Sequence, residues 1–155
     1  MALDDRTLDA LMLAALDEAR AAATHGDVPV GAVVARASDG AVVARRHNAR
    51  ERLGDPTAHA ELLALRDAAI AVRSSRLDGY VLVTTLEPCP MCAGAAVLAR
   101  VSLVAFGAAD PKAGAMGSLY HLGADPRLNH EVTVRSGFRA DECATVLAEF
   151  FAARR

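Results

Sequence analysis

The sequence predicts an α/β fold of three layers, in which helices cover both faces of a central mixed sheet of five strands. Two observations predict it. Apolar residues change along the chain between helical spacing and short β-rich runs, and helices connect the later strands. Because a helical crossover returns the chain in the same direction, the later strands are expected to pair in parallel. A length of 155 residues without repeats or a long linker predicts one domain over residues 1–155.

The first half of the chain predicts a helix, a β-hairpin and a second helix. Leu8, Leu11 and Leu16 have the spacing of one helical face. The segment Ser38-Asp39-Gly40 is typical of a tight turn between antiparallel strands. The expected elements are a helix over residues 7–23, strands over 28–35 and 41–46, a polar loop over 50–57 and a helix over 59–72.

The second half predicts alternating strands and helices that end in an amphipathic helix. Pro90 suits the first position of a helix, because the proline loses no hydrogen bond there. Phe150 and Phe151 are adjacent, so one is expected in the core and the other at the surface. The expected elements are a strand over residues 80–85, a helix over 90–99, strands over 101–106 and 131–135, an irregular stretch over 112–123 and a helix over 140–153.

The charges leave the class of partner open. A formal net charge of -2 gives no global sign of a nucleic-acid-binding protein. Arginine greatly outnumbers lysine and clusters at two places, and each cluster is either a solvated face or a local contact for phosphate groups. The clusters are Arg45, Arg46, Arg50 and Arg52 in the first half, and Arg154 with Arg155 at the end.

The first residues, the short apolar stretches and the cysteines together predict a cytoplasmic protein. The first residues lack a basic region followed by an apolar core, so no signal peptide is expected. The apolar stretches are too short to span a membrane, so no membrane partner is expected. Three cysteines cannot all pair within the chain, and in this location they are more typical of metal or redox chemistry than of disulfides.

Cys89 and Cys92 form a Cys-x-x-Cys pair at the start of an expected helix. Alone, such a pair could be a redox pair or two buried thiols. Residues three apart at a helix start can reach one point, and the helix N-terminus favours the thiolate. His59 stands at another expected helix start, behind Asp55-Pro56-Thr57. One histidine and two thiolates leave the fourth position of zinc open, so the sequence predicts one catalytic Zn²⁺ per chain.

Glu61 lies two residues after the predicted ligand His59. A carboxylate beside a metal-activated water, and not itself a ligand, suits general acid–base catalysis. The alternative is a glutamate on an exposed helix surface. The combined pattern His-x-Glu…Pro-Cys-x-x-Cys is the known signature of zinc nucleobase deaminases. We therefore predict that Glu61 is the catalytic proton shuttle.

Beyond this signature, the chain resembles the bacterial tRNA-specific adenosine deaminases of the cytidine and deoxycytidylate deaminase superfamily. The signature specifies only the superfamily, whereas the stretch from Phe106 to the C-terminus points to the tRNA enzymes. The sequence departs from the common family form at Ala109 and at Ala49-Arg50, which leaves the loop contacts open. The segments that carry the resemblance are residues 28–33, 55–61, 85–95, 106–108, 117–119, 128–130 and 140–144, with Asp110, Lys112 and the ending 150–155.

The resemblance implies a cytidine-deaminase-like α/β/α fold and the hydrolytic deamination of adenosine to inosine at the wobble position of tRNA. It also implies a homodimer whose partner is the tRNA anticodon stem-loop. The implied substrate contacts are Asn48 on the flipped adenine, Val30 on the face of that base, Asp110 at the neighbouring nucleotide, and Phe151 and Arg154 of the last helix on the anticodon loop.

Four of these five contacts have a plain structural alternative. Asn48 and Asp110 could be turn residues, Val30 a core residue, and Arg154 a helix cap. Cys143 is expected to be a buried core thiol. The remaining histidines have no ligand spacing with the cysteines and are expected to be structural or exposed, with His47 a candidate for the pocket lining; they are His25, His47, His121 and His130.

Two other functions stay open at this point. One is a deaminase of a free base such as guanine or cytosine, which would use the same zinc chemistry. The other is a non-catalytic, zinc-stabilised RNA-binding module. Glu61 argues against the module, because a structural zinc site needs no acid–base residue and normally closes its fourth position.

Overall fold

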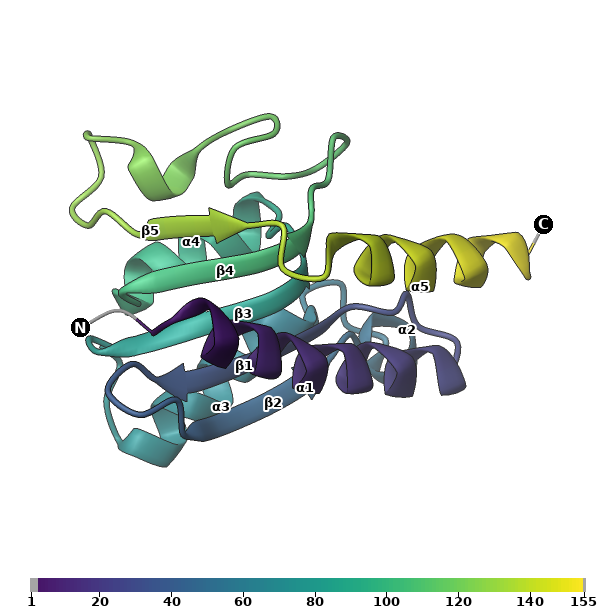
Figure 1. The fold of residues 1–155 in the computed structure, drawn as a ribbon, viewed down its shortest axis with the longest axis horizontal. Coiled ribbons are helices and arrows are strands. Elements are labelled where there is room, and N and C mark those ends of the chain that lie inside the picture. The colour runs from purple at the N-terminus through teal and green to yellow at the C-terminus, as the bar shows by residue number, and fades with distance from the viewer. Residues whose placement is uncertain (1–2, 155) are drawn as a thin grey trace.

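The structure, a computed structural model, describes residues 3–154 and has the predicted three layers (Figure 1). Arg155, part of the predicted C-terminal arginine cluster, lies outside the described residues. The helices are α1 (Asp5–Thr24), α2 (Arg50–Leu53), α3 (Ala60–Val72), α4 (Pro90–Ala99) and α5 (Ala140–Ala152), with a 3-10 turn η1 (Leu122–Ala124). The strands are β1 (Gly31–Arg36), β2 (Val42–His47), β3 (Tyr80–Leu86), β4 (Leu103–Ala108) and β5 (Thr133–Ser136).

The five strands form one mixed sheet in the order β2-β1-β3-β4-β5. Strand β1 pairs antiparallel with both β2 and β3, whereas β3, β4 and β5 run parallel to one another. This confirms the expected hairpin and the parallel pairing of β3 with β4, which α4 connects; β5 also pairs in parallel, although only the short turn η1 lies between it and β4.

Helices cover both faces of the sheet. On one face, α1 and α5 bury apolar residues against the odd-numbered positions of the central strands, for example Leu16 against Val33 and Val83 (Figure 1). On the other face, α3 and α4 pack on residues such as Leu82 and Val104. Within residues 3–154, no helix has the length and apolar character needed to cross a membrane.

Gly31 allows the closest approach between α1 and the sheet. A Cβ atom at this position would lie 1.9 Å from the carbonyl oxygen of Ala15 and 2.6 Å from the backbone nitrogen of Ala19. Only glycine permits this contact, because any larger residue would push the helix away. Helix α1 therefore lies directly over the end of the sheet where β1 begins.

Some boundaries differ from the sequence prediction. Strand β1 begins at Gly31 rather than at residue 28, because the N–H of Val30 donates to the Val28 carbonyl and serves a local turn. The predicted polar loop over 50–57 contains the short helix α2. A distant carboxylate, that of Asp27, accepts the N–H groups of α2, so local sequence could not reveal it.

One edge of the sheet collects the chain segments that carry the motifs. Gly31 at the start of β1 pairs with His47 at the end of β2, and Leu86 at the end of β3 pairs with Ala108 at the end of β4. The loops that leave these strands therefore meet at the same edge. In open α/β sheets, this is the usual place for a ligand site.

Candidate functional site

His59, Cys89 and Cys92 come together at this edge. Each ligand stands at a helix start: His59 directly precedes α3, and Cys89 directly precedes α4, with Pro90 at the first helical position. The Nδ1 atom of His59 lies 3.5 Å from the Cys89 sulfur and 3.7 Å from the Cys92 sulfur. The three donor atoms all lie within 4.8 Å of one another.

The spacing of these donor atoms fits zinc. Zn–N and Zn–S bonds of about 2.1 and 2.3 Å in a tetrahedron separate neighbouring ligand atoms by about 3.6 Å. The observed separations of 3.5 and 3.7 Å match that value. The donor set of one imidazole and two thiols is also one that zinc prefers. His59, Cys89 and Cys92 can therefore hold the ion and leave one coordination position free.

The two cysteines differ in their readiness to ionise. A hydrogen bond from Cys92, and then one from His59, lower the pKa of Cys89 to about 4. The same pairing with Cys89, together with burial, raises the pKa of Cys92. The hydrogen bond to Cys89 raises the pKa of His59. The cluster is therefore a set of groups that share protons, and binding of a metal would release those protons.

Glu61 lies in the first turn of α3, close to the cluster, and is only 4% exposed. Burial raises the pKa of Glu61 from its ordinary value to about 7. A carboxyl group that titrates near neutral pH can both accept and donate a proton, as general acid–base catalysis requires. This environment agrees with the predicted role, since a glutamate on an exposed helix surface would not be buried.

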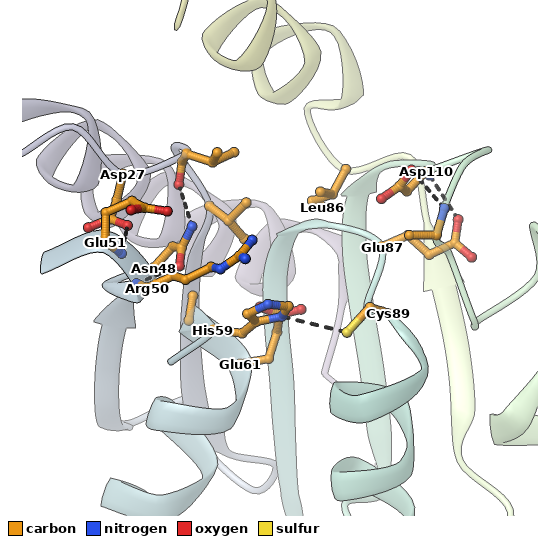
Figure 2. Close-up of a pocket in the computed structure, with 14 residues that line it drawn as sticks. Asp27, Asn48, Arg50, Glu51, His59, Glu61, Leu86, Glu87, Cys89 and Asp110 are labelled. Carbon is orange, nitrogen blue, oxygen red and sulfur yellow. Dashed lines mark hydrogen bonds between the residues drawn. The ribbon is translucent and has the colours of Figure 1, made fainter. Parts of the chain in front are cut away.

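A cavity of about 240 Å³ opens beside His59, Glu61 and Cys89 (Figure 2). The metal-ligating and acid–base groups lie between two sets of side chains, which come from different elements on either side. Val30, 8% exposed, lies in the lining together with Val28 and Ala60. A flat ring could therefore rest on an apolar surface while its edge faces the polar groups.

The Asp27 wall is formed by Asp27, Asn48, Arg50 and Glu51. The Asp27 carboxylate is 0% exposed and accepts the backbone N–H of Glu51 at 2.6 Å. The Asn48 side chain donates to the Val28 carbonyl and accepts the N–H of Arg50. These bonds tie α2 to the segment between α1 and β1, and they confirm the turn role of Asn48 that the sequence left open.

The Glu87 wall, on the other side, is formed by Leu86, Glu87, Asp110 and Ala113. Glu87 is 2% exposed and accepts the backbone N–H groups of Asp110, Met116 and Ser118 as well as the Ser118 hydroxyl. Although burial opposes the effect, these hydrogen bonds hold the pKa of Glu87 below its ordinary value. One carboxylate thus folds the loop after β4 against the cavity.

Gly114 gives Glu87 the space it occupies. A Cβ atom at this position would lie 2.3 Å from the carboxyl carbon and from one carboxylate oxygen of Glu87. The side chain of Asp110 accepts the N–H groups of Lys112 and Ala113 while lining the cavity. Asp110 is therefore a turn residue, as the alternative had it, and also faces the site.

The remaining predicted contacts lie outside the cavity lining. Phe151 is 48% exposed on α5, while Phe150 is buried, which confirms that one ring is core and the other is at the surface. Arg154 donates to the Phe150 carbonyl at 3.0 Å, and its guanidinium lies 3.4 Å from the centre of the Phe150 ring. This is the helix-capping geometry that the sequence left open. Cys143 is buried, as predicted.

The first arginine cluster is divided between ion pairs and the cavity. Arg45 pairs with Glu18, and Arg46 pairs with Asp67. Arg50 lines the cavity. Ion pairs at the surface thus engage two members of the cluster, which agrees with the solvated-face alternative for Arg45 and Arg46, while Arg50 faces the cavity.

Sequence reasoning missed the two buried carboxylates that organise the walls. Glu87 precedes the Pro-Cys pair directly, and an acidic residue that follows an apolar strand next to a ligand was a usable signal. Asp27 carried no comparable signal. His47 does not line the cavity among the described residues; it lies behind the Asp27 wall, against His25.

Known proteins that are similar to this chain belong to a zinc-binding family. Residues 5–108 match the family described as the cytidine and deoxycytidylate deaminase zinc-binding region. The chain is 47% identical over 140 residues to the tRNA-specific adenosine deaminase of Bacillus subtilis (strain 168), and the match covers 90% of this chain and 86% of that protein.

Solved structures give the same picture. A structure from studies of A-to-I editing by tRNA:A34 deaminases at the wobble position of transfer RNA superposes with a TM-score of 0.85 at 43% identity, covering 89% of this chain and 99% of that one. The guanine deaminase from Nitrosomonas europaea superposes with a TM-score of 0.79 at 27% identity, covering 98% of this chain and 86% of that one.

Proposed function

Since the chain belongs to the zinc-binding cytidine and deoxycytidylate deaminase family, and within it to the tRNA-specific adenosine deaminases, we propose that it converts adenosine to inosine at the wobble position of tRNA. The observation that carries the proposal is the buried Glu61 carboxyl beside the His59, Cys89 and Cys92 donors in one cavity. The 240 Å³ of that cavity suits a single flipped-out base.

His59, Cys89 and Cys92 hold the zinc ion in this proposal. When bound, zinc supplies a Lewis acid that makes water a strong nucleophile at neutral pH. A carboxylate oxygen of Glu61 takes a proton from the attacking water and passes it to the ring nitrogen of adenine. Glu61 then transfers the second water proton to the amino group, so that a C–O bond forms, the C–N bond breaks and ammonia leaves. The pKa of Glu61, about 7, suits a group that both accepts and donates a proton near neutral pH.

The walls bind and orient the base. Val30 packs on its face, and Asn48 contacts its edge. The Asn48 amide nitrogen donates one hydrogen to the Val28 carbonyl and keeps a second for a ligand. Asp110, at the rim, contacts the nucleotide beside the target. These contacts would exclude water from the reacting atoms and fix the base within reach of Glu61.

The surface beyond the cavity binds the anticodon stem-loop. A flipped base brings its neighbours onto the protein, and these need stacking partners and contacts for phosphate groups. The exposed ring of Phe151 offers a stacking surface. Arg154, which caps α5, carries a positive charge at the same helix end. We assign these two residues to the anticodon loop.

We further propose that the protein is a homodimer in the cytoplasm, where its tRNA substrate is found. An apolar groove beside α4, lined by Leu98, Leu122 and Leu128, supports the association of two copies. Light scattering coupled to size exclusion should give twice the 16.2 kDa mass of one chain. A monomer would remove this part of the proposal and leave the deaminase activity untouched.

A deaminase of a free base is the second candidate, favoured by the superposition with guanine deaminase. The experiment that separates the two is ammonia release from an anticodon stem-loop and from free guanine and cytosine, with sequencing of the RNA to find A-to-I changes. We expect turnover of the stem-loop only. Turnover of a free base without editing of the stem-loop would replace the proposed substrate.

Zinc removal tests the metal assignment independently. Elemental analysis should find about one zinc ion per chain, and Cys89→Ala or Cys92→Ala should lose zinc and activity together, because each sulfur supplies one of three protein ligands. Cys143→Ala is the matched control, since this buried thiol lies outside the cluster. Full activity after thorough chelation would contradict the zinc mechanism.

A further inference from the structure

Behind the Asp27 wall, two histidines connect two carboxylates in a row. The Nδ1 atom of His47 lies 2.8 Å from Glu18, and its Nε2 atom lies 3.1 Å from the Nε2 atom of His25. The Nδ1 atom of His25 lies 2.9 Å from Asp27. The row therefore runs from α1 to the wall of the cavity through two hydrogen bonds and one close contact.

Both carboxylates at the ends of the row accept hydrogen bonds from fixed donors. The Asp27 oxygens accept backbone N–H groups from Glu51 and Arg52, so both act as acceptors. Glu18 accepts a hydrogen bond from the Arg45 guanidinium at 2.9 Å. Although burial opposes it, hydrogen bonds from His47 and Arg45 keep the pKa of Glu18 below its ordinary value.

The number of ring protons follows from these contacts. A proton on Nδ1 of His47 serves its hydrogen bond to Glu18, and a proton on Nδ1 of His25 makes the close contact with the Asp27 carboxylate favourable. If both rings are neutral, their Nε2 atoms then face each other as two lone pairs. A third proton between the Nε2 atoms turns this repulsion into a hydrogen bond, whereas a fourth would place two N–H groups head to head. Three protons, and so one positive charge, make all three contacts of the row attractive.

The contact between His25 and Asp27 supports the same charge. Within residues 3–154, the buried Nδ1 atom of His25 forms no hydrogen bond of good angle, although it lies 2.9 Å from the carboxylate. Such a contact is attractive when the ring is a cation and weak or repulsive when the ring is neutral. A positive charge shared by the two rings therefore stabilises the contact between His25 and Asp27.

We propose that His25 and His47 are positioning residues that share one proton and thereby hold Asp27, and through it α2, against the cavity. Arg50 and Glu51 of α2 line that cavity. The charged groups around the pair are Glu18 from α1, Arg45 from β2 and Asp27 before β1, and the side chains of α2 follow beyond Asp27.

This arrangement makes the Asp27 wall sensitive to pH. When the pH rises and the third proton leaves, the two Nε2 atoms repel each other and the attraction to Asp27 weakens. The wall that contacts the substrate then loosens, whereas Glu61 and the zinc ligands keep their own supports. Substrate binding should weaken while the chemical step is preserved. This consequence rests on the proposed deaminase function, but the shared proton does not.

The proton count can be measured directly by NMR on the zinc-loaded protein with ¹⁵N-labelled histidine. We expect His25 and His47 to carry three ring protons together near neutral pH and to lose the third in one common step, which His47→Ala abolishes. Two neutral rings at neutral pH, or rings that titrate independently, would overturn the proposal. This result stands even if the stem-loop proves not to be the substrate.

The positioning role is tested by the pH dependence of deamination of the anticodon stem-loop. We expect the wild-type KM to rise with pH and kcat to stay level as the proton leaves. His47→Ala should raise KM about fivefold near neutral pH, as for the loss of one hydrogen bond, with kcat within about twofold. The control His121→Ala removes an exposed histidine outside the row and should change neither value.

A more conservative variant, Glu18→Gln, tests the same role if His47→Ala folds poorly. Glu18→Gln retains the shape of the side chain but removes a negative charge beside the pair, so the pair should hold its third proton less tightly. The rise in KM should therefore move to lower pH. A KM profile that Glu18→Gln and His47→Ala both leave unchanged would overturn the positioning role.

Discussion

The two walls of the cavity are each organised by one buried carboxylate, but different kinds of donor satisfy these carboxylates. Glu87 receives three backbone N–H groups and one hydroxyl. Asp27 receives two backbone N–H groups and the contact with His25. The donors of Glu87 keep their protons at any physiological pH, whereas a histidine changes its charge within that range.

Because of this difference, two walls that are each organised by a buried carboxylate respond differently to pH. A loop that is folded around a carboxylate by amide donors alone is held equally over a wide pH range. A helix held by a carboxylate that also depends on a histidine pair responds to pH. The Glu87 wall is thus the constant side of the site, and the Asp27 wall is the adjustable side.

The largest expected effect separates the chemistry from both walls. Glu61→Gln should reduce kcat by about a hundred- to ten-thousand-fold, because the amide cannot shuttle protons. The variant should keep zinc, measured by elemental analysis, and should bind the stem-loop with wild-type affinity, since neither wall is changed. Near-normal turnover would defeat the assigned role of Glu61. Weak RNA binding would indicate that the walls depend on Glu61 as well.

The second prediction breaks the constant wall. Glu87→Gln should lower the free energy of unfolding by about 3 kcal/mol, because buried N–H groups lose a charged acceptor and one faces an amide N–H₂ group. Urea unfolding of the zinc-loaded protein measures the change. Glu131→Gln, at an exposed position, is the control and should change stability by less than about 0.5 kcal/mol. Equal stability of the two variants would show that Glu87 does not hold the loop.

Breaking the adjustable wall should have a smaller effect. Asp27→Asn should lower the free energy of unfolding by about 1–2 kcal/mol, because the amide oxygen can still accept one of the two backbone N–H groups. It should also remove the pH dependence of KM, since His25 loses its anionic partner. Steady-state kinetics across pH would check this. A KM that still rises with pH in Asp27→Asn would place the titrating group elsewhere.

The smallest effect concerns the far end of the histidine row. Because the pKa of Glu18 is lowered from 4.5 in the folded protein, Glu18 contributes stability above that value, and the contribution is lost as the pH falls through the lowered pKa. For a partly exposed pair the contribution is about 1 kcal/mol or less. Urea unfolding at neutral and acidic pH should show this loss in the wild type and a smaller loss in Glu18→Gln. Identical losses of stability in the wild type and in Glu18→Gln would show that Glu18 does not contribute to the pH dependence of stability.

Much of the reactive centre could be predicted because its signals are local. His59, Cys89 and Cys92 have motif spacing, and each helix start that aims them is marked by neighbouring residues such as Pro90. Glu61 follows from the same motif. The order of helices and strands also predicted the mixed sheet, since crossover helices determine strand direction.

The walls could not be predicted in the same way, because their bonds join residues far apart in the chain. Glu87 bonds to a loop that begins 23 residues later, at Asp110. Asp27 accepts N–H groups 24 and 25 residues away, from Glu51 and Arg52. No periodicity or short motif reports such pairs, and α2 was expected to be loop for this reason.

The sequence by itself therefore predicted the layers of the fold, the three residues that can hold zinc and the candidate acid–base residue, because helical spacing, strand order and helix starts are properties of short segments. Only the tertiary structure decided which residues support that chemistry. Burial gives Glu61 a pKa of about 7, and the packing of α1 on β1 and β2 brings Glu18 to His47. Burial and long-range contact depend on the whole packed chain, and the properties of Glu87 and Asp27 arise from them.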